Sequence, residues 1–172
     1  ESVIKAVLLA FLIQWICFTP AYILQTEKFY DLTGSLTYLT LILFSIFNAG
    51  SLGFASLIVC ACVSVWAVRL GSFLFLRIKK DGEDKRFRSI KTSFTRFFMT
   101  WTLQGMWVTM CLLCVTTALS SEGGIKEGVG FYLGLIVFII GFGLEVSADM
   151  QKTRFRKNPE NKDKFISTGL WA

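Results

Sequence analysis

Residues 134–156 read GLIVFIIGFGLEVSADMQKTRFR, an apolar run that gains two carboxylates, Glu145 and Asp149, before it turns basic. At about 100° per residue, an α-helix places both carboxylates on one stripe with Gly141 and Lys152. Carboxylates in an apolar span are costly without partners, so the stripe marks a candidate functional site. The alternative is a helix end where both acids are hydrated and pair locally with Lys152.

The composition is that of an integral membrane protein. Of 172 residues, 53% are hydrophobic and only 17% are charged. In soluble domains, roughly a quarter of the residues are charged. The apolar residues come in long runs, which predict an all-α bundle of about five transmembrane helices in a single transmembrane domain. The expected spans cover about residues 3–24, 35–47, 52–76, 97–119 and 129–148. The second is short for a full crossing, which normally takes about 20 residues.

Several classes of function are excluded by the residues that the chain lacks or places in apolar surroundings. The absence of histidine removes Ser-His-Asp and Cys-His catalysis and the commonest metal ligand. Cys111 and Cys114 have CxxC spacing, but they lie in an apolar stretch, where thiols pack as small apolar groups. We therefore expect no metal site.

The net charge of +6 comes mainly from two basic blocks beside apolar spans, residues 77–96 with eight Lys/Arg and residues 151–164 with six. The positive-inside rule places such blocks in the cytosol and the poorly charged link 120–128 on the opposite side, so nucleic acid is not the expected partner. The following charged residues would then gather at one membrane face: Arg77, Asp84, Arg86, Glu145, Asp149 and Lys152.

Arg69 lies about seven residues inside the third span. Its side chain could extend to the interface, or it could face the bundle interior and either pair with an acid or bind an anion. Glu145 is the partner we expect if Arg69 pairs within the protein.

Several motifs occur in a fixed order along the sequence and together indicate a family. They are Trp66-x-x-Arg69-Leu70, Arg77, Gly82-Glu83-Asp84-Lys85-Arg86-Phe87, Gln104-Gly105, Gly141-x-x-x-Glu145-x-x-Ala148-Asp149-x-Gln151-Lys152-x-x-Phe155 and Gly169-Leu170-Trp171. The set resembles the uncharacterised branch of the steroid 5-alpha-reductase-like family, from about Lys28 to the end of the sequence.

The resemblance implies a multi-helix protein of the endoplasmic reticulum, or of the bacterial inner membrane, that binds NADPH from the cytosol. It also implies reduction of a carbon–carbon double bond in a steroid-like or other lipid substrate. Membrane lipids would surround the protein. The resemblance does not identify the catalytic acid. The residues that would bind the cofactor by analogy are Arg69, Arg77, Asp84, Arg86, Gln104, Glu145, Asp149 and Lys152. Asp84 would contact the ribose or hold Arg86 in place.

The sequence departs from the family after Gly169-Leu170-Trp171, where the family continues with Ser-Arg-His-Pro-Asn-Tyr and further helices. It also lacks the family's proline late in the fourth span, where residues 114–116 read Cys-Val-Thr. We therefore expect a segment of a longer protein whose cofactor pocket is incomplete. Two alternatives stay open: a non-catalytic membrane scaffold or pseudoenzyme, and a membrane methyltransferase that uses S-adenosylmethionine.

Overall fold

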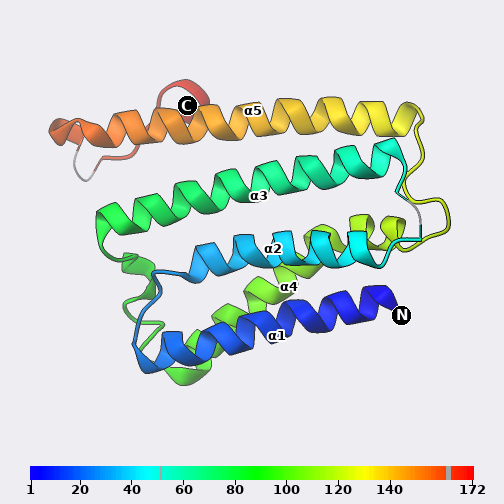
Figure 1. Ribbon diagram of the computed structural model, residues 1–172. Helices are drawn as coiled ribbons and strands as arrows, with labels where there is room; N and C mark the ends of the chain where they lie inside the picture. Colours follow the sequence, from blue (N-terminus) through cyan, green and yellow to red (C-terminus); the bar gives the residue numbers. More distant parts are fainter. Residues whose placement is uncertain (51, 162–163) are drawn as a thin grey trace. The chain divides into compact units, whose positions relative to one another are not determined.

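The computed structural model describes residues 1–50, 52–161 and 164–172, so Lys162 of the second basic block lies outside the described residues. The described chain is α-helical and contains no strand (Figure 1). Its long helices are α1 (Ser2–Ile23), α2 (Tyr30–Phe47), α3 (Phe54–Asp81), α4 (Phe94–Leu119) and α5 (Val129–Lys157). All five are long and apolar enough to cross a membrane, which confirms the predicted all-α membrane fold.

The helices extend beyond the apolar runs that predicted them. Helix α2 begins at Tyr30 and has 18 residues, about 27 Å at 1.5 Å per residue and close to the thickness of a bilayer core. Helix α3 continues to Asp81 and α5 to Lys157. These three helices are longer than the predicted spans because backbone hydrogen bonding continues beyond the apolar residues into the polar boundary of the membrane.

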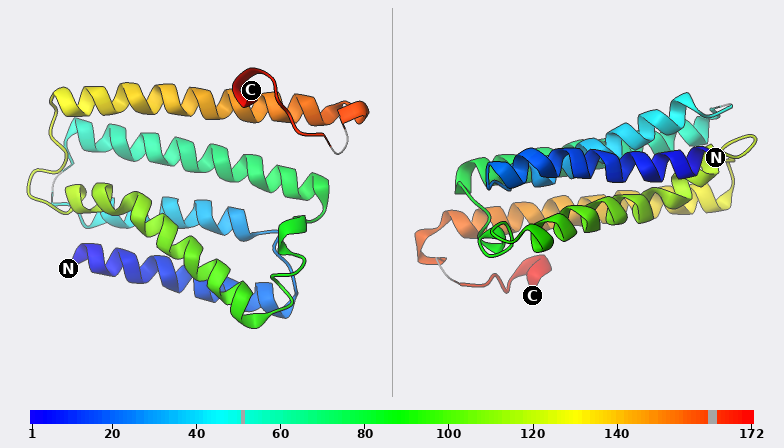
Figure 2. Two further views of the ribbon diagram at one scale, coloured as in Figure 1. Left: turned by 180° about the vertical axis from the view of Figure 1, so that it is seen from behind. Right: turned by 90° about the horizontal axis from the view of Figure 1, so that it is seen from below.

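The chain forms two compact units, unit 1 (Glu1–Lys126) and unit 2 (Glu127–Ala172). In unit 1, α2 is central, since it packs against α1, α3 and α4, while α1 also packs along α4 (Figures 1 and 2). Unit 2 consists of α5 with two short 3-10 helices, η2 (Pro159–Asn161) and η3 (Gly169–Trp171), that fold back against it.

Unit 1 buries several polar groups within its apolar core and exposes many large apolar side chains, the arrangement expected when the solvent is lipid. Gln14 is fully buried in α1 and donates through Nε2 to Thr37 Oγ1 of α2 at 2.9 Å. Ser35 of α2 donates to the Ala67 carbonyl of α3 at 2.8 Å. Large apolar side chains such as Leu8 instead point outward and are 63% exposed. The outward faces are therefore suited to lipid, and hydrogen bonds join the helices inside.

Glycines allow the helices of unit 1 to approach closely. A Cβ at Gly71 of α3 would lie 2.5 Å from the Cβ of Ser35, and one at Gly105 of α4 would lie 3.2 Å from the Cγ of Gln14. Only a residue without a side chain fits Gly71, because Ser35 is short and fixed to the α2 backbone.

Unit 1 has two different ends (Figure 1). Residues 24–31 and 77–96, which link α1 to α2 and α3 to α4, meet at one end, which we call the charged end. They contain nine Lys/Arg and five Asp/Glu, a net charge of +4. The turns after α2 and after α4 lie at the opposite end.

Candidate functional site

The first turn at the charged end is shaped by the end of α1. Gln25 has φ of 49°, in the left-handed region. Thr26 N–H donates to the Ala21 carbonyl at 2.9 Å and Gln25 N–H to the Tyr22 carbonyl at 3.2 Å. These bonds form the Schellman arrangement that closes a helix, and they direct the next residues, including Glu27, back toward the helix ends.

Glu27 holds the two links of the charged end together. Its side chain is only 2% exposed, and its carboxylate accepts hydrogen bonds from Lys91 Nζ at 2.8 Å and from the backbone N–H of Asp84 at 3.0 Å. A buried carboxylate needs such partners because desolvation penalises its charge. Glu27 therefore fixes residues 84–91 against the beginning of α2.

The segment after α3 is organised by Asp84. Helix α3 ends at Asp81, and Gly82 has φ of 81°, which glycine adopts without strain. The Asp84 carboxylate then accepts from the backbone N–H of Arg86 at 3.0 Å and from Nη2 of its guanidinium at 2.5 Å. The Arg86 guanidinium and N–H hold the pKa of Asp84 below its usual range, and Asp84 raises the pKa of Arg86. Asp84 thus holds Arg86 in place, one of the two roles predicted for it.

Arg77 lies at the same end, near the start of α2. Its Nη2 is 3.9 Å from Asp31 Oδ2, and both side chains are about one-third exposed. At this distance the two groups form an ion pair but no hydrogen bond. The N–H donors of the Arg77 guanidinium therefore stay available for other acceptors. Close by in the sequence, Arg88 is 60% exposed and donates through Nε to Glu83 at 2.9 Å.

Aromatic rings support the charged groups from within unit 1. Phe87, from the same short segment as Asp84, is buried in a cluster with Phe97 and Trp101 of α4. The Tyr30 ring lies 5.1 Å from that of Phe87 and 5.2 Å from that of Trp101, and Tyr30 Oη donates to the Thr100 carbonyl at 3.0 Å. The link between α3 and α4 is therefore anchored by packing as well as by charge.

Gln104 lies deeper between α2 and α4. Its Nε2 donates to the Tyr30 carbonyl at 3.2 Å, and a Cβ at Gly34 would lie 3.1 Å from its Cδ. Its buried Oε1 has no hydrogen-bond partner among the described residues, like Nε1 of Trp101 one turn earlier. Gln104 thus joins two helices and keeps one acceptor available.

Of the remaining predicted cofactor residues, Arg69 lies on α3 with its guanidinium 5.1 Å from the centre of the Phe73 ring. The two residues are four positions apart and so share one face of α3, where they form a cation–π contact. The predicted pairing of Arg69 with Glu145 stays a prediction.

In unit 2, Glu145, Asp149 and Lys152 follow one another along α5. Lys152 Nζ lies 4.4 Å from the centre of the Trp171 ring, a cation–π contact. Trp171 Nε1 also donates to the Ala148 carbonyl at 3.0 Å, and Leu170 N–H donates to Gln151 Oε1 at 3.0 Å. The motif around Asp149 and the Gly-Leu-Trp motif, far apart in sequence, are thus in contact.

The structure brings together three predicted site residues at the charged end, since Asp84 pairs with Arg86 and its pKa is lowered chiefly by Arg86 and also by the nearby Arg77. Sequence reasoning missed Glu27 and Lys91 as partners. The only sequence signal for Glu27 is an acid just after an apolar span, and its partner lies 64 residues away, a separation that no helical periodicity relates.

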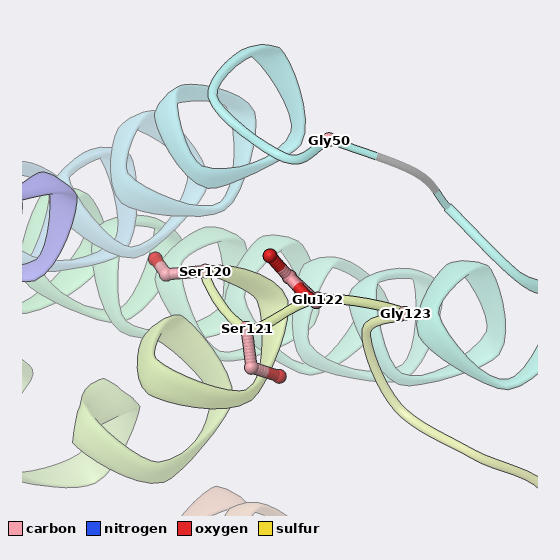
Figure 3. Close-up of a pocket in the computed structure, with 5 residues that line it drawn as sticks. All are labelled: Gly50, Ser120, Ser121, Glu122 and Gly123. Carbon is pink, nitrogen blue, oxygen red and sulfur yellow. The ribbon is translucent and has the colours of Figure 1, made fainter.

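A shallow pocket at the opposite end of unit 1 contains none of the predicted site residues (Figure 3). It has a volume of about 310 Å³ and is lined by Gly50, Ser120, Ser121, Glu122 and Gly123. Within the described ranges, no three His, Cys, Asp or Glu side chains are grouped to hold a metal ion.

Comparison with known proteins gives one family. Residues 17–172 match the family described as "Protein of unknown function (DUF1295)". No curated protein and no solved structure matches the sequence. The match covers all the motifs from Trp66 to Trp171, and the chain therefore belongs to this DUF1295 family.

Proposed function

We propose that this chain belongs to a membrane reductase that uses NADPH to reduce a carbon–carbon double bond in a steroid-like or other lipid substrate. The endoplasmic reticulum, or the bacterial inner membrane, is its proposed location, with the charged end in the cytosol. The motif set that resembles the steroid 5-alpha-reductase-like family lies within the matched residues. The observation that supports the proposal most is the meeting of Arg77, Asp84 and Arg86 at the charged end.

The donors at the charged end suit the phosphates of NADPH. Arg86 uses Nε and Nη2 for Asp84, and its side chain is 70% exposed, so Nη1 can donate to a phosphate oxygen. Arg77 keeps its donors because its contact with Asp31 is 3.9 Å long. Arginine binds phosphate through two parallel N–H bonds. Asp84 would pre-orient Arg86 and so reduce the entropy lost on binding.

The other predicted residues would act around the same cofactor. Lys152, held over Trp171, would supply a further cation, while Glu145 and Asp149 would accept from ribose or nicotinamide groups. Arg69 would bind a phosphate or one of these acids, and the Gln104 Oε1 would accept one more hydrogen bond. NADPH, when bound, supplies a hydride to a polarised alkene, and a protein acid supplies the proton.

Equilibrium binding to the full-length protein tests the proposal. We expect NADPH fluorescence to change on titration with a saturable isotherm, and S-adenosylmethionine, measured separately by calorimetry, to show no binding. Binding of S-adenosylmethionine alone would replace the reductase with a methyltransferase. If neither NADPH nor S-adenosylmethionine binds, both the reductase and the methyltransferase are contradicted.

A non-catalytic scaffold is the second candidate, and one observation favours it. Both arginines that would bind the phosphates already pair with an acid of the same chain, Arg77 with Asp31 and Arg86 with Asp84, as in a purely structural ion-pair network. A scaffold predicts that Glu145→Gln and Asp149→Asn leave NADPH affinity unchanged, whereas the reductase predicts that both weaken it.

A further inference from the structure

The cations of the charged end fall into two sets. Four of them contact an acid: Arg77 with Asp31, Arg86 with Asp84, Arg88 with Glu83 and Lys91 with Glu27. The other five are exposed and form no ion pair with any described residue: Lys28 in the link between α1 and α2, and Lys79, Lys80, Lys85 and Arg96 within residues 77–96. The net positive charge of this end is therefore presented largely by these five, and we call the four within residues 77–96 the outer cations.

The outer cations lie where the helices of unit 1 leave the apolar layer. Lys79 and Lys80 are in the last turn of α3, three and four residues after Leu76, which is 63% exposed. At 1.5 Å per residue they lie about 5 Å further along the axis. Arg96 is in the first turn of α4, three residues before Met99 on the same face, which is 48% exposed. Charge and exposed apolar surface therefore adjoin on two helices.

We propose that the outer cations bind the phosphate headgroups of anionic phospholipids in the adjacent leaflet. Cations next to a membrane span attract anionic lipid, with roughly 1 kcal/mol for each Lys or Arg near the surface. The neighbouring Leu76 and Met99 would stay exposed to water beside a bound nucleic acid or soluble anion, whereas the acyl chains of a phospholipid cover them. Lysine, three of the four outer cations, suits mobile headgroups because it acts as a point charge without a fixed geometry.

This surface is separate from the proposed cofactor site, since none of the outer cations was assigned to NADPH. Among the described residues at the opposite end of unit 1, Lys5 pairs with Glu1, and no cluster of cations is present. The link 120–126 carries only Lys126 and Glu122, which leaves no net charge there. Preference for anionic lipid should therefore belong to one end of unit 1.

The test uses the full-length protein reconstituted in nanodiscs of phosphatidylglycerol and phosphatidylcholine, with native mass spectrometry of the retained lipids. The test variant is Lys79→Ala/Lys80→Ala/Lys85→Ala/Arg96→Ala. One matched control keeps the charges, Lys79→Arg/Lys80→Arg/Lys85→Arg/Arg96→Lys, and the other removes a cation at the opposite end, Lys126→Ala.

We expect the wild type and both controls to retain phosphatidylglycerol preferentially and the alanine variant to lose about tenfold or more of that preference. Equal preference in all four proteins would overturn the proposal. Millimolar inorganic phosphate that displaces phosphatidylglycerol would also overturn it, in favour of a free-phosphate site. If the alanine variant does not fold, the salt dependence of lipid binding by the wild-type protein tests the proposal instead. The wild-type preference should fall as salt rises from 50 to 500 mM, and a preference independent of salt contradicts the proposal.

Discussion

Single residues in unit 1 decide how closely its helices pack. Lipid is as apolar as leucine, so helices in a membrane gain little from burying apolar surface, and they associate through close packing and hydrogen bonds. Gln14 bonds to Thr37 and Ser35 to the Ala67 carbonyl. The Gln14 contact is the interhelical hydrogen bond for which membrane glutamines are commonly used, between two fully buried side chains. These polar residues specify which helix faces meet.

Gly71→Ala tests this packing. The new Cβ would lie 2.5 Å from the Ser35 Cβ, so α2 and α3 must separate. We expect the free energy of unfolding to fall by about 1–3 kcal/mol, measured by circular dichroism during titration with sodium dodecyl sulfate. The control is Gly134→Ala in α5, where no atom of unit 2 lies within 4 Å of the added Cβ and the helix should be unaffected or stabilised. Equal loss in both variants would contradict the close approach.

Asp84 gives a prediction about pH. Its pKa is lowered by the Arg86 guanidinium and N–H, so the contact stabilises the folded link above the unfolded-state pKa of about 3.9. That stabilisation is lost as the pH falls through the lower folded-state pKa. Carbon-13 NMR of labelled aspartate should show the Asp84 carboxyl titrating below 3.9, and Arg86→Ala should move the midpoint upward. A midpoint that Arg86→Ala leaves unchanged would show that the ion pair does not form in solution.

At the scale of elements, the sequence predicted which segments are helices better than where they end. All five helices follow from apolar length, but apolar length marks only the part within lipid. Helix α2 begins five residues before the predicted 35 because Tyr30 and Asp31 find partners, in Phe87 and Arg77, that lie more than forty positions away in sequence. The end of α3 is set locally, because it falls at Asp81-Gly82, a pair typical of turns, and the positive φ of Gly82 favours glycine.

The contact between η3 and α5 is an element-scale prediction. Gly169 has φ of 64°, and an added Cβ would lie 2.6 Å from Gln151 Oε1. We expect Gly169→Ala to release residues 169–172 from α5, seen as faster hydrogen exchange at the backbone N–H of Leu170. The control is Gly128→Ala, at an extended φ of −179° with nothing within 4 Å. Unchanged exchange in Gly169→Ala would mean that the segment does not dock on α5 in solution.

For the whole molecule, hydropathy and charge predict the class of protein but not the contacts of its site. The grouping of Arg77, Asp84 and Arg86 followed from their common position next to spans. Their acid partners could not be predicted in the same way, since the Glu27–Lys91 contact joins links separated by two helices. Such a contact depends on which helices pack together, and a single sequence does not specify that.

Membrane topology is testable with single cysteines in a cysteine-free background. We expect Ser89→Cys and Thr153→Cys, in the two basic blocks, to react with an impermeant maleimide added to the cytosolic face. Ser121→Cys, in the link after α4, should react only from the opposite face. Labelling of positions 89 and 121 from the same side would contradict the predicted number of crossings.

The central claim, that the charged end holds the phosphates of NADPH, is tested most directly by the NADPH affinity of arginine variants of the full-length protein. We predict that Arg77→Ala and Arg86→Ala each weaken binding by about 10- to 100-fold, the loss expected for a charged hydrogen bond. Arg88→Ala removes an exposed arginine two residues from Arg86, paired with Glu83, and should change the affinity less than twofold. Equal affinities in the wild type and all three variants would contradict the claim.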